Sequence, residues 1–278
     1  MNLFKHPGEP ASFYIGWQPK VADEYRRFGR VLIITLLVVC CIIAWFIVSN
    51  QRGFSSGVYE RNHETELEGM LQLNPFPAIK TFYGKDIYGN PVVKTIPLVN
   101  FGKFGADPII EKISSEHNND LNALWVKVKG KLEYNHGAAL LELSAREKSI
   151  ESVSAISKEE KKLIAPAKIQ ELGLVTLHGQ IVDPKCYLGV MKPAEGKPHS
   201  DCAIRCIAGG IQPMFVIRNE KGEETFFILR GEKGEPVNEK ILCDIGIPVE
   251  VSGKLSRVDD WLVLYVNPEK GINVVNGE

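Results

Sequence analysis

The chain has 278 residues, of which 44% are hydrophobic and 24% are charged. This composition excludes a disordered or collagen-like polymer, and the length fits one or two domains. The 33 basic and 34 acidic residues leave a formal net charge of -1. Because that balance provides no general attraction for a polyanion, we expect that nucleic acid is not a partner.

An apolar run without charges, residues 31–49, follows a more polar leader, residues 1–30. As a helix, its 19 residues would extend about 28 Å, which matches the hydrocarbon thickness of a bilayer. The run lacks the polar stripe of an amphipathic core helix. Its bulky end at Trp45 and Phe46 also differs from a signal-peptide cleavage site. We therefore predict one transmembrane helix.

Basic residues lie mainly before this run: Lys20, Arg26, Arg27 and Arg30. The positive-inside rule then places the leader in the cytoplasm and the main domains outside it. We predict a single-pass protein of the cell membrane, which in a bacterium would be the inner membrane with the main domains in the periplasm. The expected partners are the lipid bilayer and another membrane protein or complex.

The body of the chain is internally repeated. Residues 126–143 correspond to residues 249–266 at a constant spacing of 123. Residues 96–113 correspond to 224–241 at a spacing of 128, and the pair Glu68-Gly69 corresponds to His178-Gly179 at a spacing of 110. Two copies of one small β domain explain all three matches.

Both copies show short alternating apolar runs broken by Gly, Pro and Asn turns, which is typical of small barrels. We predict a mainly β protein in which a single N-terminal transmembrane helix precedes two tandem, OB-like β-barrel domains joined by a short helix. Ser157 and Glu160 have the spacing of a capping box and suggest that helix. The predicted segments are the leader 1–30, the transmembrane helix 31–49, the first barrel 60–153, the linker helix 154–171 and the second barrel 172–278.

The change in spacing from 110 to 128 assigns about 18 extra residues to the second copy, after its first strand. We place this insertion at residues 186–210, which are rich in Cys and His. Cys202 and Cys206 are one helical turn apart, so their thiols can face the same way. The predicted metal ligands are Cys186, His199, Cys202 and Cys206, with Met191 and Cys243 as possible further sulfur ligands.

Three interpretations of this insertion remain open. Outside the cytoplasm, four cysteines commonly form two disulfides. Three thiolates and an imidazole suit zinc, and an added methionine makes the set attractive to copper. A redox pair or an iron–sulfur cluster is allowed by the number of cysteines. A Rieske centre needs two histidines, and this segment has one. The sequence has no C-x-x-C-H, which excludes that type of haem attachment. The cofactor is therefore unknown, with zinc, copper or iron as candidates.

The sequence contains no G-x-S-x-G, H-E-x-x-H, Walker or kinase pattern. Carboxylate pairs such as Asp259-Asp260 are interpreted as solvated turn residues, and we assign no catalytic residue. We expect a membrane-anchored, non-enzymatic accessory subunit of a respiratory or metal-handling membrane complex. Its extracytoplasmic Cys/His loop would be a metal or redox centre, or a disulfide-locked docking surface. The alternative is a membrane-tethered thiol–disulfide or metal-dependent enzyme that uses Cys202 and Cys206.

Overall fold

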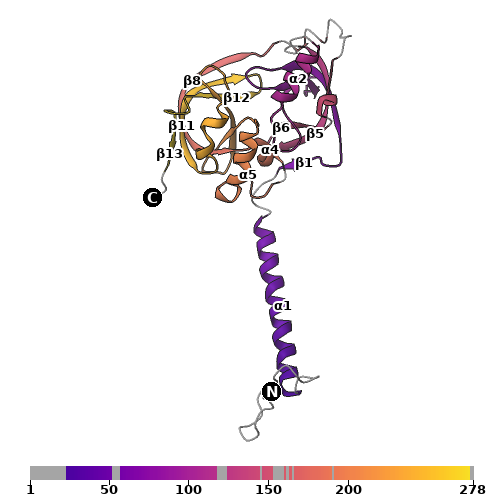
Figure 1. The fold of residues 1–278 in the computed structure, drawn as a ribbon, viewed down its shortest axis with the longest axis vertical. Helices are drawn as coiled ribbons and strands as arrows, with labels where there is room; N and C mark the ends of the chain where they lie inside the picture. Colours follow the sequence, from indigo (N-terminus) through magenta and orange to yellow (C-terminus); the bar gives the residue numbers. More distant parts are fainter. Residues whose placement is uncertain are drawn as a thin grey trace. The chain divides into compact units, whose positions relative to one another are not determined.

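The computed structural model describes residues 23–51, 57–117, 124–144, 146–152, 160, 163–164, 166–189 and 191–275. The chain divides into two compact units, Met1–Gly53 and Phe54–Glu278. The first unit contains one long helix, and the second contains two β-sheets (Figure 1). Most of the predicted leader lies outside the described residues.

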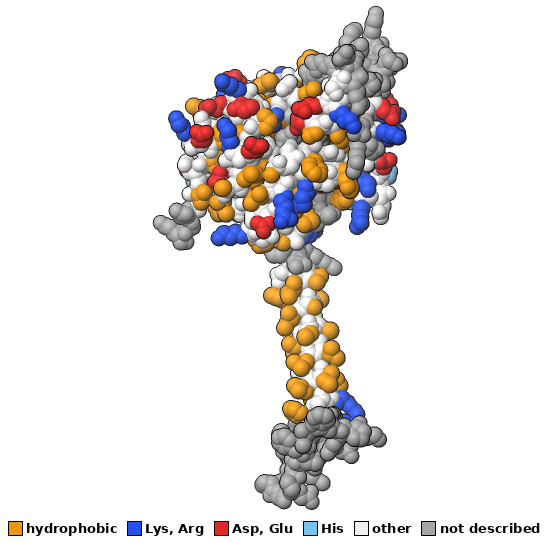
Figure 2. Space-filling model, viewed as in Figure 1, with side chains coloured by type: hydrophobic (Ala, Val, Ile, Leu, Met, Phe, Trp, Pro, Cys, Tyr) orange, Lys and Arg blue, Asp and Glu red, His pale blue; other side chains and the backbone are white. Residues whose placement is uncertain are grey.

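The helix of the first unit, α1 (Asp23–Gln51), contains the whole predicted span 31–49. Within its segment Tyr25–Asn50, an 18-residue window has a mean hydropathy of 3.3, and none of that window is buried. Figure 2 shows apolar side chains along the length of this helix. By length and composition α1 is able to cross a membrane, a property that a transmembrane span and a signal sequence share. The choice of a span and its orientation stay predictions.

The first sheet of the second unit has the strand order β1-β5-β2-β3-β4-β6, with β7 paired to β5. It closes into a barrel-like form because β5 pairs with both β2 and β6. The β4–β6 pair is parallel. The elements are β1 (Val58–Tyr59), β2 (Thr65–Gln72), β3 (Ala78–Lys85), β4 (Pro91–Val99), α2 (Asp107–His117), β5 (Trp125–Asn135), β6 (Ala138–Leu143), η1 (Arg146–Ser149) and β7 (Ile150–Ser152).

The second sheet has the order β12-β10-β9-β8-β11-β13 and closes through a β11–β12 pair. Here β10 and β12 are the parallel pair. The elements are β8 (Ile169–Val182), α4 (Pro184–Leu188), α5 (Lys197–Ala208), β9 (Met214–Arg218), β10 (Glu224–Gly231), η2 (Asn238–Lys240), η3 (Leu242–Asp244), β11 (Pro248–Val258), β12 (Trp261–Val266) and β13 (Ile272–Val274). The chain is thus mainly β, with two barrel-like sheets after an apolar helix.

Glycines that match between the two copies occupy equivalent places in the two sheets. A Cβ atom on Gly69 would lie 2.0 Å from a carbonyl oxygen of β3, and one on Gly179 would lie 2.2 Å from a carbonyl oxygen of β9. The corresponding distances are 2.4 Å at Gly130 and 2.3 Å at Gly253, to carbonyl oxygens of β6 and β12. Since a side chain would collide with the backbone of the neighbouring strand, each copy needs glycine at these two positions.

The sequence match at a spacing of 128 does not align β4 of the first copy correctly with β10 of the second. Leu98 pairs with Leu141 in the first sheet, and Leu229 pairs with Leu264 in the second. Leu98 and Leu229 are therefore equivalent, at a spacing of 131. The spacing of 128 came from aligned prolines that lie after these strands. The segments that follow β4 and β10 differ in length, so the prolines do not give the spacing of the strands themselves.

The predicted linker helix is only partly tested by the structure. A hydrogen bond of 3.2 Å from the Ile164 amide to the Glu160 carbonyl has helical spacing. The predicted helix ends too late, however, because β8 already begins at Ile169, which pairs with Val258 of β11. Much of the remaining linker, including residues 153–159, lies outside the described residues.

One apolar cluster is shared by the two sheets, in addition to a core of each sheet's own. A single cluster of buried side chains contains Phe76 and Leu140 from the first sheet region and Leu188 and Trp261 from the second. The Trp261 indole meets the Phe76 ring edge-on at 6.3 Å and donates a hydrogen bond of 2.7 Å to the Thr95 carbonyl. Because apolar burial is the main stabilising term in folding, this shared core joins the sheets into one packed body.

Candidate metal centre

The Cys-rich residues lie in the connection between β8 and β9, which contains α4 and α5. The equivalent connection in the first sheet, residues 73–77, contains no helix. Asp183 caps α4: its carboxylate accepts a hydrogen bond of 2.9 Å from the Lys185 amide, and Pro184 occupies the first helical position. Both are favoured helix-start features. They fix Asp183 and Cys186 on a single short turn.

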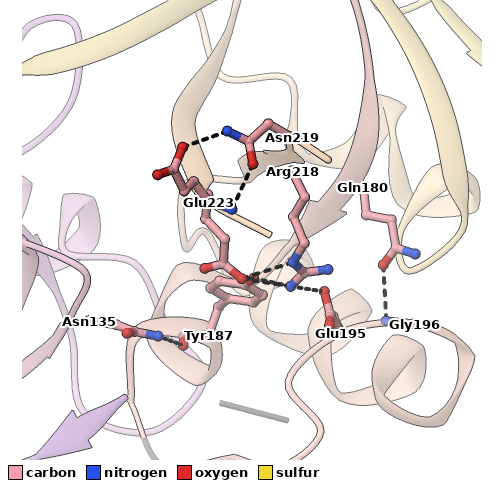
Figure 3. A network of polar contacts seen from close by, with 9 residues as sticks. Asn135, Gln180, Tyr187, Glu195, Gly196, Arg218, Asn219 and Glu223 are labelled. Atoms are coloured by element: carbon pink, nitrogen blue, oxygen red, sulfur yellow. Dashed lines mark hydrogen bonds and ion pairs between the residues drawn. The ribbon is translucent and has the colours of Figure 1, made fainter. Parts of the chain in front are cut away.

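The second helix, α5, carries three of the predicted ligands. His199, Cys202 and Cys206 are spaced three and four residues apart, so they follow one side of the helix. His199 is 4% exposed and Cys206 is 2% exposed. The start of α5 is tied to β8, since the Gly196 amide donates a hydrogen bond of 3.2 Å to Gln180 (Figure 3).

A polar network holds the same insertion against the second sheet (Figure 3). The Tyr187 hydroxyl donates to Glu224 at 2.8 Å, and the Arg218 guanidinium donates to that hydroxyl at 2.5 Å. Arg218 also pairs with Glu195 at 2.7 Å. Since Tyr187 follows Cys186 directly and Glu195 precedes α5, this network fixes both helices relative to β9 and β10.

Three sulfurs from the two helices converge. The Sγ atoms of Cys186, Cys202 and Cys206 all lie within 4.8 Å of one another. Those of Cys186 and Cys202 are 4.0 Å apart, whereas a disulfide bond measures about 2.05 Å. Two sulfurs on a tetrahedral zinc with Zn–S of about 2.3 Å lie about 3.8 Å apart. The sulfur triangle therefore has the size that a bound metal ion requires.

Two buried polar atoms extend this cluster. Ligand atoms of Asp183, Cys186 and His199 also lie within 4.8 Å of one another, so Cys186 belongs to both groups. In the described structure, His199 Nε2 and Asp183 Oδ2 are buried and have no hydrogen-bond partner. An unpaired buried polar atom is costly, and a metal ion would provide the missing partner. The donor set therefore fits a metal.

The electrostatic environment of the cluster is set by burial and by nearby charges. Burial is the main cause that lowers the pKa of His199, which keeps the imidazole neutral and able to bind a metal. The pKa of Cys186 is raised, first by its hydrogen bond with Cys206 and next by burial. A metal ion that binds Cys186 therefore has to displace the proton of this thiol.

A lysine from the first sheet region completes the cluster. Lys103, in the connection between β4 and α2, donates a hydrogen bond of 2.9 Å to Cys202 Sγ and a longer contact of 3.8 Å to Cys206 Sγ. The hydrogen bond to Cys202 is the main cause that raises the pKa of Lys103. The candidate site thus contains residues from both halves of the second unit.

The two further sulfurs lie elsewhere. Cys243 is exposed in η3 and belongs to neither ligand group of the described residues. Met191 is 43% exposed in the connection between α4 and α5. The sequence analysis missed Asp183 and Lys103. The Asp183-Pro184 pair is a recognisable helix start, but no local pattern marks Lys103, which is 99 residues from Cys202.

No family model matches the chain, and no curated protein matches it. Among solved structures, the chain is similar to the single-stranded DNA binding protein from Thermus aquaticus, with 11% identity, 80% of this chain and 95% of that chain covered, and a TM-score of 0.21. A deletion mutant of the same protein matches with 12% identity, 80% and 96% coverage and a TM-score of 0.21. This similarity is too low to support a functional conclusion.

One expectation about partners is corrected. The sequence analysis excluded nucleic acid, whereas the matched solved structures are single-stranded DNA binding proteins. The exclusion relied on a formal net charge of -1, which is a sum over the whole chain. Such a sum does not describe the charge on one face of a barrel. We therefore withdraw the exclusion of nucleic acid as a partner.

Proposed function

We propose that this chain is a membrane-anchored, non-enzymatic metal-binding protein, with its centre formed by Cys186, Cys202, Cys206 and His199. Asp183 is an additional oxygen ligand that the sequence analysis did not include. The observation that carries this proposal is the convergence of three sulfurs with two buried polar atoms that lack partners. Thiolate and imidazole ligands favour zinc, and a thiolate-rich set also suits Cu(I).

The framework of the proposal is a pair of tandem OB-like barrels outside the cytoplasm, anchored by α1. In the first sheet β2 pairs with β3 and β5, and β4 runs parallel to β6. In the second sheet β8 pairs with β9 and β11, and β10 runs parallel to β12. A five-stranded Greek-key barrel of the OB type has this architecture. A role as an accessory subunit of a respiratory or metal-handling membrane complex is part of the proposal and derives from the sequence alone.

The environment of the thiols supports metal binding rather than thiol–disulfide exchange. A reactive cysteine needs exposure and a depressed pKa. Cys206, one of the two cysteines that this alternative uses, is instead 2% exposed. A tethered thiol–disulfide enzyme that uses Cys202 and Cys206 is therefore the less supported alternative.

The test is metal analysis of the full chain, purified in detergent under reducing conditions and reconstituted with Zn²⁺. We expect bound zinc close to one equivalent per chain, lost in Cys202→Ser and Cys206→Ser. Cys243→Ser is the matched control, because this exposed cysteine is outside both ligand groups, and it should retain the metal. Absence of bound metal in the wild type, with a thiol count that reveals disulfides, would overturn the proposal.

A further inference from the structure

The connection that carries Lys103 is docked directly onto the end of α5. The Gly105 amide donates a hydrogen bond of 3.0 Å to the Gly209 carbonyl. A Cβ atom on Gly209 would lie 1.8 Å from the Lys103 carbonyl oxygen, so the two backbones are in contact. This contact requires glycine at position 209 and fixes the backbone from which the Lys103 side chain reaches the sulfurs.

The charge of the proposed centre explains why an ammonium group lies there. Three thiolates and a divalent ion have a net negative charge, and the buried Asp183 carboxylate adds to it. Buried uncompensated charge is strongly unfavourable. The neighbouring Lys185 does not compensate it, because its ammonium group pairs with Glu142 and donates to the Gly102 carbonyl at 2.6 Å.

We infer that Lys103 is a positioning residue of the metal centre, which stabilises the Cys202 thiolate by a charge-assisted hydrogen bond. This inference rests on the proposed function and adds that the first barrel contributes to the site. Residues that hydrogen-bond to metal ligands orient them and tune their affinity. Metal affinity therefore depends on contact between the two sheets, although every proposed ligand belongs to the insertion of the second.

The experiment is a Co²⁺ titration of the full chain in detergent, followed by thiolate-to-cobalt absorbance. We expect Lys103→Met to weaken Co²⁺ binding by about 10- to 100-fold, the usual effect of removing such a partner. Lys103→Arg keeps the charge and should restore most of the affinity. Lys94→Met is the matched control: Lys94 also lies in the first sheet and pairs across to Asp260 at 4.0 Å, away from the sulfurs.

The outcomes separate this inference from the proposed function. If the wild type gives no thiolate-to-cobalt absorbance, the metal-binding proposal itself fails. If the wild type and Lys103→Met bind Co²⁺ equally, the role of Lys103 is wrong and the metal centre stands. Equal losses in Lys103→Met and Lys103→Arg would also overturn a role based on charge. Thermal melts of the metal-free variants show whether each remains folded.

Discussion

At the scale of single residues, Glu133 illustrates how burial controls charge beside the insertion. This carboxyl in β5 is 3% exposed. Its pKa is raised to about 8, chiefly by burial, while Lys185 opposes the shift and Glu142 adds to it. The neutral acid is therefore the form that the folded state favours at pH 7.

This shift predicts a pH-dependent stability. Between pH 4.5 and about 8 the folded state holds a proton on Glu133 that the unfolded state has lost, so stability falls as the pH rises. Glu133→Gln should remove that dependence and stabilise the protein at pH 9 by about 3–5 kcal/mol.

The measurement is urea unfolding with a chelator present, from pH 5 to 9. Glu239→Gln is the control because Glu239 is exposed. If the unfolding free energies of wild type and Glu133→Gln depend on pH in the same way, Glu133 does not hold this proton.

Local sequence patterns predict some contacts around the sulfurs and not others. The spacing of Cys202 and Cys206 predicted that their thiols lie on one helix face, and their sulfurs lie within 4.8 Å of each other. Lys103 approaches the same sulfurs from a distant part of the chain, with no periodic pattern linking it to them. Its role follows only from tertiary packing.

At the scale of elements, the turn between β11 and β12 is part of the junction between the sheets. The sequence analysis interpreted Asp259 as a solvated turn residue. Instead, its carboxylate forms an ion pair of 2.9 Å with Lys80 of β3, and the two side chains are 14% and 6% exposed. Turn residues are usually solvated, but here the turn packs against another sheet.

Removing the charge of Asp259 should weaken this junction. Asp259→Asn tolerates the positive φ of 54°, yet it removes the carboxylate that pairs with the buried Lys80 ammonium. We expect a loss of about 3 kcal/mol in unfolding free energy, measured by chemical denaturation. Glu171→Gln breaks an exposed pair with Lys254 and should cost less than about 1 kcal/mol. Equal effects of both substitutions would contradict a buried role for Asp259.

At the scale of the whole second unit, the shared core predicts joint unfolding of the two sheets. Leu141 is fully buried in the core of the first sheet. Leu141→Ala should cost about 3 kcal/mol. Since the sheets are packed together, that loss should increase amide exchange in β11 as well as in β2.

Hydrogen-exchange mass spectrometry of the full chain measures this effect. Leu174→Ala, at a position 85% exposed in β8, serves as the control and should leave exchange nearly unchanged. Faster exchange confined to the first sheet would mean that the two sheets unfold separately.

Much of the architecture was predictable at this scale. The apolar run indicated α1, and repeated glycines indicated a duplicated β domain because strand contacts exclude side chains at Gly130 and Gly253. The junction was not predictable, since nothing local to Trp261 or Phe76 shows that their rings meet.

The ion pair between Lys80 and Asp259 also has a consequence for biosynthesis. These residues are 179 positions apart, and a chain is synthesised from its N-terminus. The first barrel and its lysines therefore emerge well before the last turn of the second barrel. Until that turn is made, the ion pair cannot form. The junction between the two sheets is therefore completed only when synthesis of the chain is nearly finished.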